Sequence, residues 1–266
     1  MDLATVIGLV GAWGALLVSS IIEGTNLRSL LAPSAFILVI GGTLGATIIS
    51  YSMEDVAALP KVMTLAFKKQ DTDPLKFIDL LVEFAEKARR EGLLILQEFI
   101  KDTQDKFLVR GMNLVIDGAD PELVRNILET EIVFLEKRHN TAASMFETAG
   151  GFAPTMGIIG TVVGLITVLG NIEDSAALSK GIAVAFLATF YGIGTANLLW
   201  LPLGNKLKLK SKVELLIKEM ILEGILSIQA GENPRIVREK LEVFLPPKLQ
   251  QAAKEQDKEK GGGPGE

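Results

Sequence analysis

Four stretches of this 266-residue chain are apolar, contain no Asp, Glu, Lys, Arg or His, and are long enough to cross a membrane. About 20 helical residues, each rising ~1.5 Å, cover the hydrocarbon core of a bilayer, which is roughly 30 Å thick. The pattern therefore predicts an all-α, polytopic membrane protein with four transmembrane helices. They occupy residues 3–22, 33–52, 148–172 and 181–203.

The polar segments also have helical patterns. Asp73-Pro74, Asp120-Pro121 and Asn233-Pro234 each place a capping side chain before a proline at the first turn of a helix. Apolar residues follow at helical spacing, and no segment sustains the alternation of a β-strand. We expect the last of these helices to stop at Pro246-Pro247.

These patterns divide the chain into five segments. We expect the first two transmembrane helices in residues 1–52, a large helical loop in 53–147, the third and fourth transmembrane helices in 148–203, a helical C-terminal region in 204–249, and a disordered tail in 250–266, which is rich in Lys, Glu, Gln and Gly.

The basic residues predict the orientation of the spans. Of the 27 Lys and Arg residues, 13 lie in residues 53–147 and 12 in residues 204–266, which leaves only Arg28 and Lys180. The positive-inside rule then places the large loop and both termini in the cytoplasm. A cleaved signal peptide is the weaker interpretation of the first span, because it starts with Asp2 and has no basic region.

Composition removes several classes of function. The chain has no cysteine and one histidine, His139, so disulfides and Cys or His metal clusters are excluded. No set of nucleophile, base and metal ligands suggests a membrane enzyme, and no cofactor, metal or nucleic acid is expected. A free-standing transporter would need an ionisable group within its own spans. Any such group must therefore come from a partner.

The third and fourth spans carry small residues along one face. In the third, Gly157, Gly160 and Gly164 share a face with Thr161; in the fourth, Gly192 lies on the same face as Thr189 and several alanines. Small faces let helices approach closely inside a membrane. The spacing does not distinguish packing within one subunit from an interface between subunits.

Two prolines and two threonines are candidates for a mechanical and an ionic role. Pro154 and Pro202 lie near the cytoplasmic ends of the third and fourth spans, where each removes a backbone hydrogen bond and forms either an ordinary kink or a hinge. The hydroxyls of Thr161 and Thr189 either bond their own preceding turn or line a cation path.

At this point the sequence resembles the A subunit of the flagellar motor stator, the MotA/PomA family. The resemblance rests on several stretches in family order, which are MDLAT at 1–5, ARREGLL at 88–94, DGADPEL at 117–123, APTMGIIGT at 153–161 and TFYG at 189–192, continuing to Leu201-Pro202-Leu203.

The resemblance implies a stator unit in the bacterial inner membrane. Five A subunits would surround two single-span B subunits of the MotB/PomB type, each supplying an intramembrane Asp that ions load and unload. Membrane lipid would be a further partner. Motion of the ring would pass through the large loop to the rotor protein FliG.

Site residues follow from the same resemblance. Arg89, with Arg90 beside it, falls on the loop arginine that faces charges of the rotor, although without the family these two would be a solvated basic surface. The acidic residue that the family has in this loop falls on Gln97, and Glu98 lies next to it. On a helix, neighbouring side chains point about 100° apart, so the offset leaves open whether Glu98 replaces the missing acid.

The resemblance also assigns roles within the membrane. Pro154 and Pro202 fall on prolines tied to coupling, and Thr161 and Thr189 lie next to the ion path. Threonine oxygens and a sodium-type N-terminus favour sodium over protons as the coupling ion. The alternative is the ExbB/TolQ type, which has three spans with its large loop after the first; the two spans before the loop here favour the flagellar type.

Overall fold

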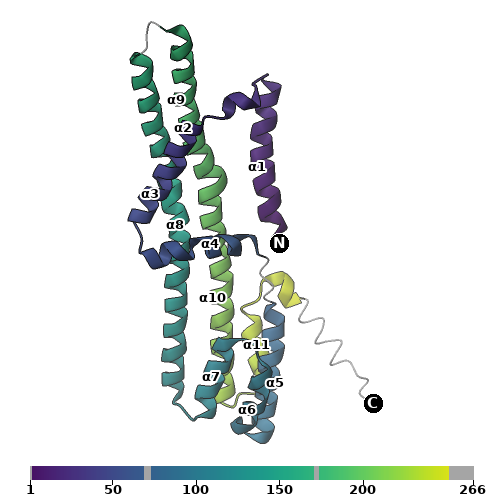
Figure 1. The fold of residues 1–266 in the computed structure, drawn as a ribbon. Helices are drawn as coiled ribbons and strands as arrows, with labels where there is room; N and C mark the ends of the chain where they lie inside the picture. Colours follow the sequence, from purple (N-terminus) through teal and green to yellow (C-terminus); the bar gives the residue numbers. More distant parts are fainter. Residues whose placement is uncertain (1, 69–72, 171–173, 252–266) are drawn as a thin grey trace. The chain divides into compact units, whose positions relative to one another are not determined.

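The computed structural model describes residues 2–68, 73–170 and 174–251, and every regular element in these ranges is a helix (Figure 1). None of the described residues lies in a β-strand, so the predicted all-α fold is confirmed. The chain divides into two compact units. The membrane unit comprises Met1–Gln70 and Arg138–Lys210, and the loop unit comprises Asp71–Lys137 and Ser211–Glu266.

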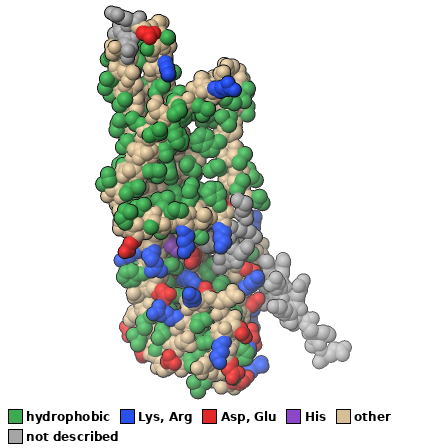
Figure 2. Space-filling view, viewed as in Figure 1, with side chains coloured by type: hydrophobic (Ala, Val, Ile, Leu, Met, Phe, Trp, Pro, Cys, Tyr) green, Lys and Arg blue, Asp and Glu red, His purple; other side chains and the backbone are tan. Residues whose placement is uncertain are grey.

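Within the described residues, four helical segments are long and apolar enough to cross a membrane, as the sequence predicts. They are Leu3–Ile22, Leu27–Ile49 and parts of Pro121–Leu169 and Ser175–Gln229. In Figure 2, hydrophobic side chains dominate the surface of the membrane unit, whereas Lys, Arg, Asp and Glu are common over the loop unit.

The membrane unit contains the four spans and one further helix. Asp2 caps the first helix by accepting the backbone N–H of Thr5. The helix after Ser52 packs on this unit through the buried Ala66, although it lies within segment 53–147. The elements are α1 (Leu3–Ile22), η1 (Leu27–Leu30), α2 (Pro33–Phe36), the π-helical turn η2 (Ile37–Gly41), α3 (Gly42–Ile49), α4 (Met53–Phe67), most of α8 (Pro121–Leu169), α9 (Ser175–Thr195), the π-helical turn η5 (Ala196–Trp200) and the start of α10 (Leu201–Gln229).

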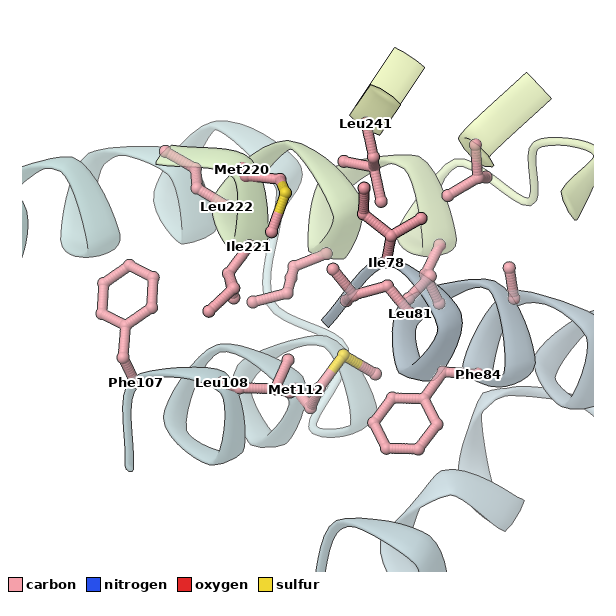
Figure 3. Close-up of a cluster of buried hydrophobic side chains, with 14 of the residues drawn as sticks. Ile78, Leu81, Phe84, Phe107, Leu108, Met112, Met220, Ile221, Leu222 and Leu241 are labelled. Atoms are coloured by element: carbon pink, nitrogen blue, oxygen red, sulfur yellow. The ribbon is translucent and has the colours of Figure 1, made fainter. Parts of the chain in front are cut away.

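The loop unit is built around one apolar core. Leu81, Phe84, Leu108, Met112 and Ile221 are almost completely buried and converge there from different helices (Figure 3). Burial of each such side chain contributes about 1.5–3 kcal/mol. The elements are α5 (Pro74–Glu91), η3 (Leu93–Ile95), α6 (Leu96–Phe99), η4 (Ile100–Asp102), α7 (Lys106–Ile116), the start of α8, the end of α10 and α11 (Pro234–Glu242).

The three predicted helix starts are observed. The carboxylate oxygens of Asp73 and Asp120 and the side-chain oxygen of Asn233 each accept a backbone N–H two residues further on. The third of these helices, α11, ends at Glu242, before the predicted stop at Pro246-Pro247, because the chain tightens into a turn that buries Leu245.

The predicted tail lies largely outside the described residues. Gln250 and Gln251 belong to a short helical segment that begins at Pro247, so the first two residues of segment 250–266 are helical. The expectation of disorder for the remainder, residues 252–266, lies outside the described residues.

Candidate functional site

Helices α8 and α9 pack backbone against backbone within one chain. A Cβ atom added at Gly157 would lie 2.9 Å from the carbonyl oxygen of Ala188, and one added at Gly192 would lie 2.5 Å from that of Ala153. Both distances are too short for a real side chain, so only glycine fits. The structure therefore brings these two small faces together within the subunit, one of the two arrangements that the sequence left open.

Gly160 and Gly164 continue the same contact. A Cβ atom at Gly160 would lie 2.5 Å from the Cβ of Ala188, and one at Gly164 would lie 2.8 Å from the Cβ of Ala185. Close approach through small residues is how helices associate where lipid gives no hydrophobic drive. All four candidate packing glycines thus serve the α8–α9 pair.

The two candidate threonines meet across this contact. The hydroxyl oxygens of Thr161 and Thr189 are 2.5 Å apart, and that of Thr161 also lies 3.0 Å from the carbonyl oxygen of Ala185 and 3.1 Å from that of Gly157. One hydroxyl has one proton, so Thr161 donates to one of these oxygens at a time. Four oxygens therefore gather at one partly buried point.

This oxygen cluster fits both interpretations of the threonines. The bond from Thr161 to Gly157 is the ordinary bond to the preceding turn. The bonds from Thr161 to α9 fit the second interpretation, a cation path, because hydroxyl and carbonyl oxygens are the groups that hard cations coordinate. The cluster has no ionisable group, so it cannot carry a proton by itself.

The two candidate prolines lie at irregular places in their helices. Pro154 lies inside α8, and Pro202 is the second residue of α10, directly after the π-helical turn η5. Pro202 has no N–H for the carbonyl of Leu198, and a widened turn is a common site of helix bending. A Cβ at Gly150, one turn before Pro154, would lie 2.6 Å from the side chain of Leu201, so the prolines are at similar heights.

Two tyrosines that the sequence analysis gave no role tie the second span to α8 and α9. The Tyr191 hydroxyl accepts the backbone N–H of Ala32 at 3.0 Å and donates to the carbonyl of Leu30. The Tyr51 hydroxyl bonds that of Thr148 at 2.8 Å. A tyrosine in an apolar stretch signals such a bond, because its buried hydroxyl needs a partner, but the partner is not predictable.

The four candidate rotor-facing residues are all exposed in the loop unit. Arg89 and Arg90 lie in the last turn of α5, where positive charge also complements the helix dipole. Gln97 and Glu98 lie in α6. These two short regions are tied by Lys87 on α5, whose ammonium nitrogen lies 3.2 Å from the centre of the Phe99 ring and 2.6 Å from Glu83.

A cluster at the start of α1 also escaped the sequence analysis. The Asp2 carboxylate lies 2.6 Å from the ammonium group of Lys206 on α10, and this bond holds the pKa of Asp2 below its usual value. The backbone N–H of Asp2 donates to the carbonyl of Phe67 at 2.9 Å. Lys210 donates to the carbonyls of Leu65 and Ala66 at the end of α4. We call Asp2, Lys206 and Lys210 the N-terminal clasp.

An ion pair in the loop unit connects the end of α10 to α11. Glu232 and Lys240 lie 2.6 Å apart; their bond lowers the pKa of Glu232 and raises the pKa of Lys240. Among the described residues, no three His, Cys, Asp or Glu side chains form a group that could hold a metal ion.

Comparison with known families gives two matches. Residues 6–92 match the motility protein A N-terminal family, and residues 100–220 match the MotA/TolQ/ExbB proton channel family. Motility protein A of Bacillus subtilis (strain 168) is 37% identical over 249 residues, covering 93% of this chain and 92% of its own length. Chemotaxis protein PomA of Vibrio alginolyticus is 33% identical over 245 residues, covering 92% and 96%.

Two solved structures are also similar. The C. jejuni MotAB structure has a TM-score of 0.89 at 33% identity, and the flagellar MotAB stator complex from Bacillus subtilis has a TM-score of 0.88 at 36% identity. Each comparison covers 93% of this chain and 97% of the other.

Proposed function

This chain belongs to the motility protein A family, and from that premise we propose how it works as the A-type stator subunit of a bacterial flagellar motor. With a B-type subunit it forms an ion channel that converts sodium or proton flow into torque. The ExbB/TolQ alternative is disfavoured by two spans before the long loop and by the motility-specific match at residues 6–92.

The observation that carries the mechanism is the absence of Asp, Glu, Lys, Arg and His from all four predicted spans. An ion that crosses the membrane needs a site that gains and loses charge. The B-type subunit supplies this site as an intramembrane Asp, and the chain acts as a non-enzymatic housing around it. The stoichiometry proposed from the resemblance is five A subunits around two B subunits.

The exposed faces of α8 and α9 support such an assembly. Ile158, Val162, Ile166 and Phe186 are each more than half exposed in the single chain. Side chains of this kind need lipid or another apolar helix against them. One part of this surface would face neighbouring subunits and B helices, and the rest would face lipid.

The oxygen cluster at Thr161 and Thr189 is proposed to line the ion path. Its hydroxyl and carbonyl oxygens suit a hard cation, which favours sodium as the coupling ion over protons. Each ion that loads the B-subunit carboxylate changes the local charge by one unit. A potential of 100 mV supplies about 2.3 kcal/mol for each charge moved across the membrane.

This energy would bias two arrangements of the membrane helices. The glycine contacts make α8 and α9 one rigid pair, and Pro154 and Pro202 mark the points where that pair can bend at its cytoplasmic end. The movement would reach FliG through the exposed Arg89, Arg90 and Glu98. This requires both termini and the loop unit in the cytoplasm of a cell with this chain in its inner membrane.

The test is ion flux in reconstituted vesicles. The chain alone should give no selective sodium or proton flux, and the chain purified with its B-type partner should give flux that an Asp→Asn change in the partner span abolishes. Selective flux from the chain alone would contradict the proposal. Swimming speed measured against sodium concentration at fixed pH then identifies the coupling ion.

A further inference from the structure

A cavity of about 320 Å³ lies between α1 and the junction of η5 with α10. The two helices run alongside each other in the membrane unit (Figure 1). Gly8 and Ala12 lie on the α1 wall, Leu199 and Pro202 lie on the opposite wall, and Lys206 closes one end. The lining is apolar except for Lys206, a threonine and an asparagine.

Helix α1 is fixed at its start by an ion pair, and further along it contacts η5 without closing the space between them. No residue of α1 is buried, and nothing lies within 4 Å of the position that a Cβ atom of Gly8 would take. The ion pair between Asp2 and Lys206, at 2.6 Å, holds the start of α1 against α10. Beyond this N-terminal clasp, the small residues of α1 leave the space open.

Water is a poor occupant for this space. The space is open on one side and most of its lining is apolar, so an apolar occupant is favoured over water. Both walls belong to segments that span the membrane, where acyl chains are the available apolar molecules.

The polarity of the cavity matches a phospholipid. An acyl chain needs an apolar length, and its phosphate needs a positive charge at the end nearest the cytoplasm. Lys206 lies at that end, and the clasp places two lysines, Lys206 and Lys210, beside the single carboxylate of Asp2. Lys residues near a membrane surface attract anionic lipid headgroups.

We propose that this cavity binds one acyl chain of a membrane phospholipid, with its phosphate beside Lys206. Its effect on coupling rests on the proposed function: a fluid chain beside Pro202 fills the space without fixing the helix, so α10 keeps room to bend there. A protein side chain in the same place would fill the space and also restrict the bending of α10.

The test uses photolabelling of the full chain purified with its B-type partner. The complex is placed in vesicles of phosphatidylethanolamine and phosphatidylglycerol that contain a phosphatidylglycerol with a diazirine midway along one acyl chain. After irradiation, mass spectrometry locates the adducts. We expect adducts at Leu199 and Pro202, on the wall that faces α1.

Two glycines of α1 form a matched pair of variants. Gly8→Leu places a side chain in the cavity and should lower the adducts on that wall roughly tenfold, equal to about 1.4 kcal/mol of binding free energy. Gly11→Leu adds the same side chain outside the cavity lining, where nothing lies within 4 Å, and should leave the adducts unchanged. Ala12→Leu repeats the first change one turn away, in case Gly8→Leu fails to assemble.

Equal adducts in the Gly8→Leu and wild-type complexes, or none on this wall, would overturn the proposal. So would a second copy in the cavity, which a short bis-maleimide would reveal by joining Gly8→Cys chains; the chain has no other cysteine. Labelling needs neither ion flow nor motility, so its outcome is separate from that of the flux experiment.

Discussion

Helix α1 and the α8–α9 pair both carry spaced glycines, but only the pair uses them for packing. At Gly157 and Gly192 an added Cβ atom would meet backbone atoms of the facing helix within 3 Å. At Gly8, Gly11 and Gly14 it would meet nothing within 4 Å. One region is held along its length by backbone contact, and the other mainly at its end by the N-terminal clasp.

The difference shows that small residues permit contact without creating it. Close approach needs a second small face in register, as the alanines of α9 provide for the glycines of α8. Among the described residues, none comes within 4 Å of a Cβ atom placed at Gly8, Gly11 or Gly14 of α1. A rigid pair and a loosely held helix in one membrane unit suit a machine in which one part moves relative to another.

The largest expected effect comes from breaking the rigid pair. Gly192→Val should force the backbones of α8 and α9 apart, because its Cβ would lie 2.5 Å from the carbonyl oxygen of Ala153. Overpacking costs about 1–3 kcal/mol, and more where the neighbour is backbone. We expect loss of both assembled complex and swimming. Gly14→Val in α1 is the control, and equal amounts of the two variants in the membrane would contradict the comparison.

The second prediction concerns the prolines that end the rigid pair. Pro154→Ala and Pro202→Ala should leave assembly with the B-type subunit largely intact while swimming speed falls several-fold. A change of ~1.4 kcal/mol in the balance of two arrangements shifts their ratio tenfold, and each charge moved supplies only about 2.3 kcal/mol at 100 mV. Measuring the amount of assembled complex alongside swimming speed distinguishes a coupling hinge from a purely structural proline. Parallel loss of complex and of swimming would indicate the structural role.

The third prediction tests the proposal that the α8–α9 contact lines the ion path. Thr161→Val removes the hydroxyl that bonds Ala185 and Thr189 across the pair, and should raise the sodium concentration for half-maximal speed about tenfold, the equivalent of ~1.4 kcal/mol. Thr167→Val, at an exposed position of α8, is the control. If Thr161→Val lowers speed equally at every sodium concentration, the hydroxyl serves packing instead.

The sequence predicted what depends on local pattern. The spans follow from hydropathy. Asp73, Asp120 and Asn233 predict where their helices begin, because a capping side chain bonds backbone groups within the first turn. The shared face of Thr161 and Thr189 with the glycines also follows from helical spacing. These are properties of a few neighbouring residues.

The remaining features depend on partners far away in the chain. Asp2 finds Lys206, and Tyr191 finds Leu30 and Ala32, only after the helices pack. The π-helical turns η2 and η5 have no local signal in the sequence except Pro202, which lies two residues after η5. The sequence also could not predict whether a helix packs through its glycine face, because this depends on the helix that lies opposite.

The fourth prediction moves to the loop unit, where the effects are smaller. An exposed charge pair contributes only about 0–1 kcal/mol, so Arg89→Ala should be mild, whereas Arg89→Glu should impair swimming and be partly rescued by charge reversal on the rotor. The resemblance places an acidic residue of the family at Gln97, which is uncharged, so we expect Gln97→Ala to matter less than Glu98→Lys. Immotile Gln97→Ala cells with normal Glu98→Lys cells would show that the second contact is misassigned.

The smallest expected effect is at the clasp that holds α1. Asn caps a helix as well as Asp does, so Asp2→Asn keeps the cap and removes the ion pair with Lys206. The pKa of Asp2 is lowered in the folded chain by that bond, so its contribution is present above its unfolded pKa of about 3.9 and is lost as pH falls through the lower folded value. Hydrogen exchange in the first turn of α1 should therefore be faster in Asp2→Asn than in wild type at pH 7, and the difference should shrink as pH falls below about 3.9 and vanish only below the lower folded pKa of Asp2. Asp174→Asn, at the cap of α9, is the matched control. A difference that persists unchanged below that pH would mean that the cap, and not the ion pair, holds α1.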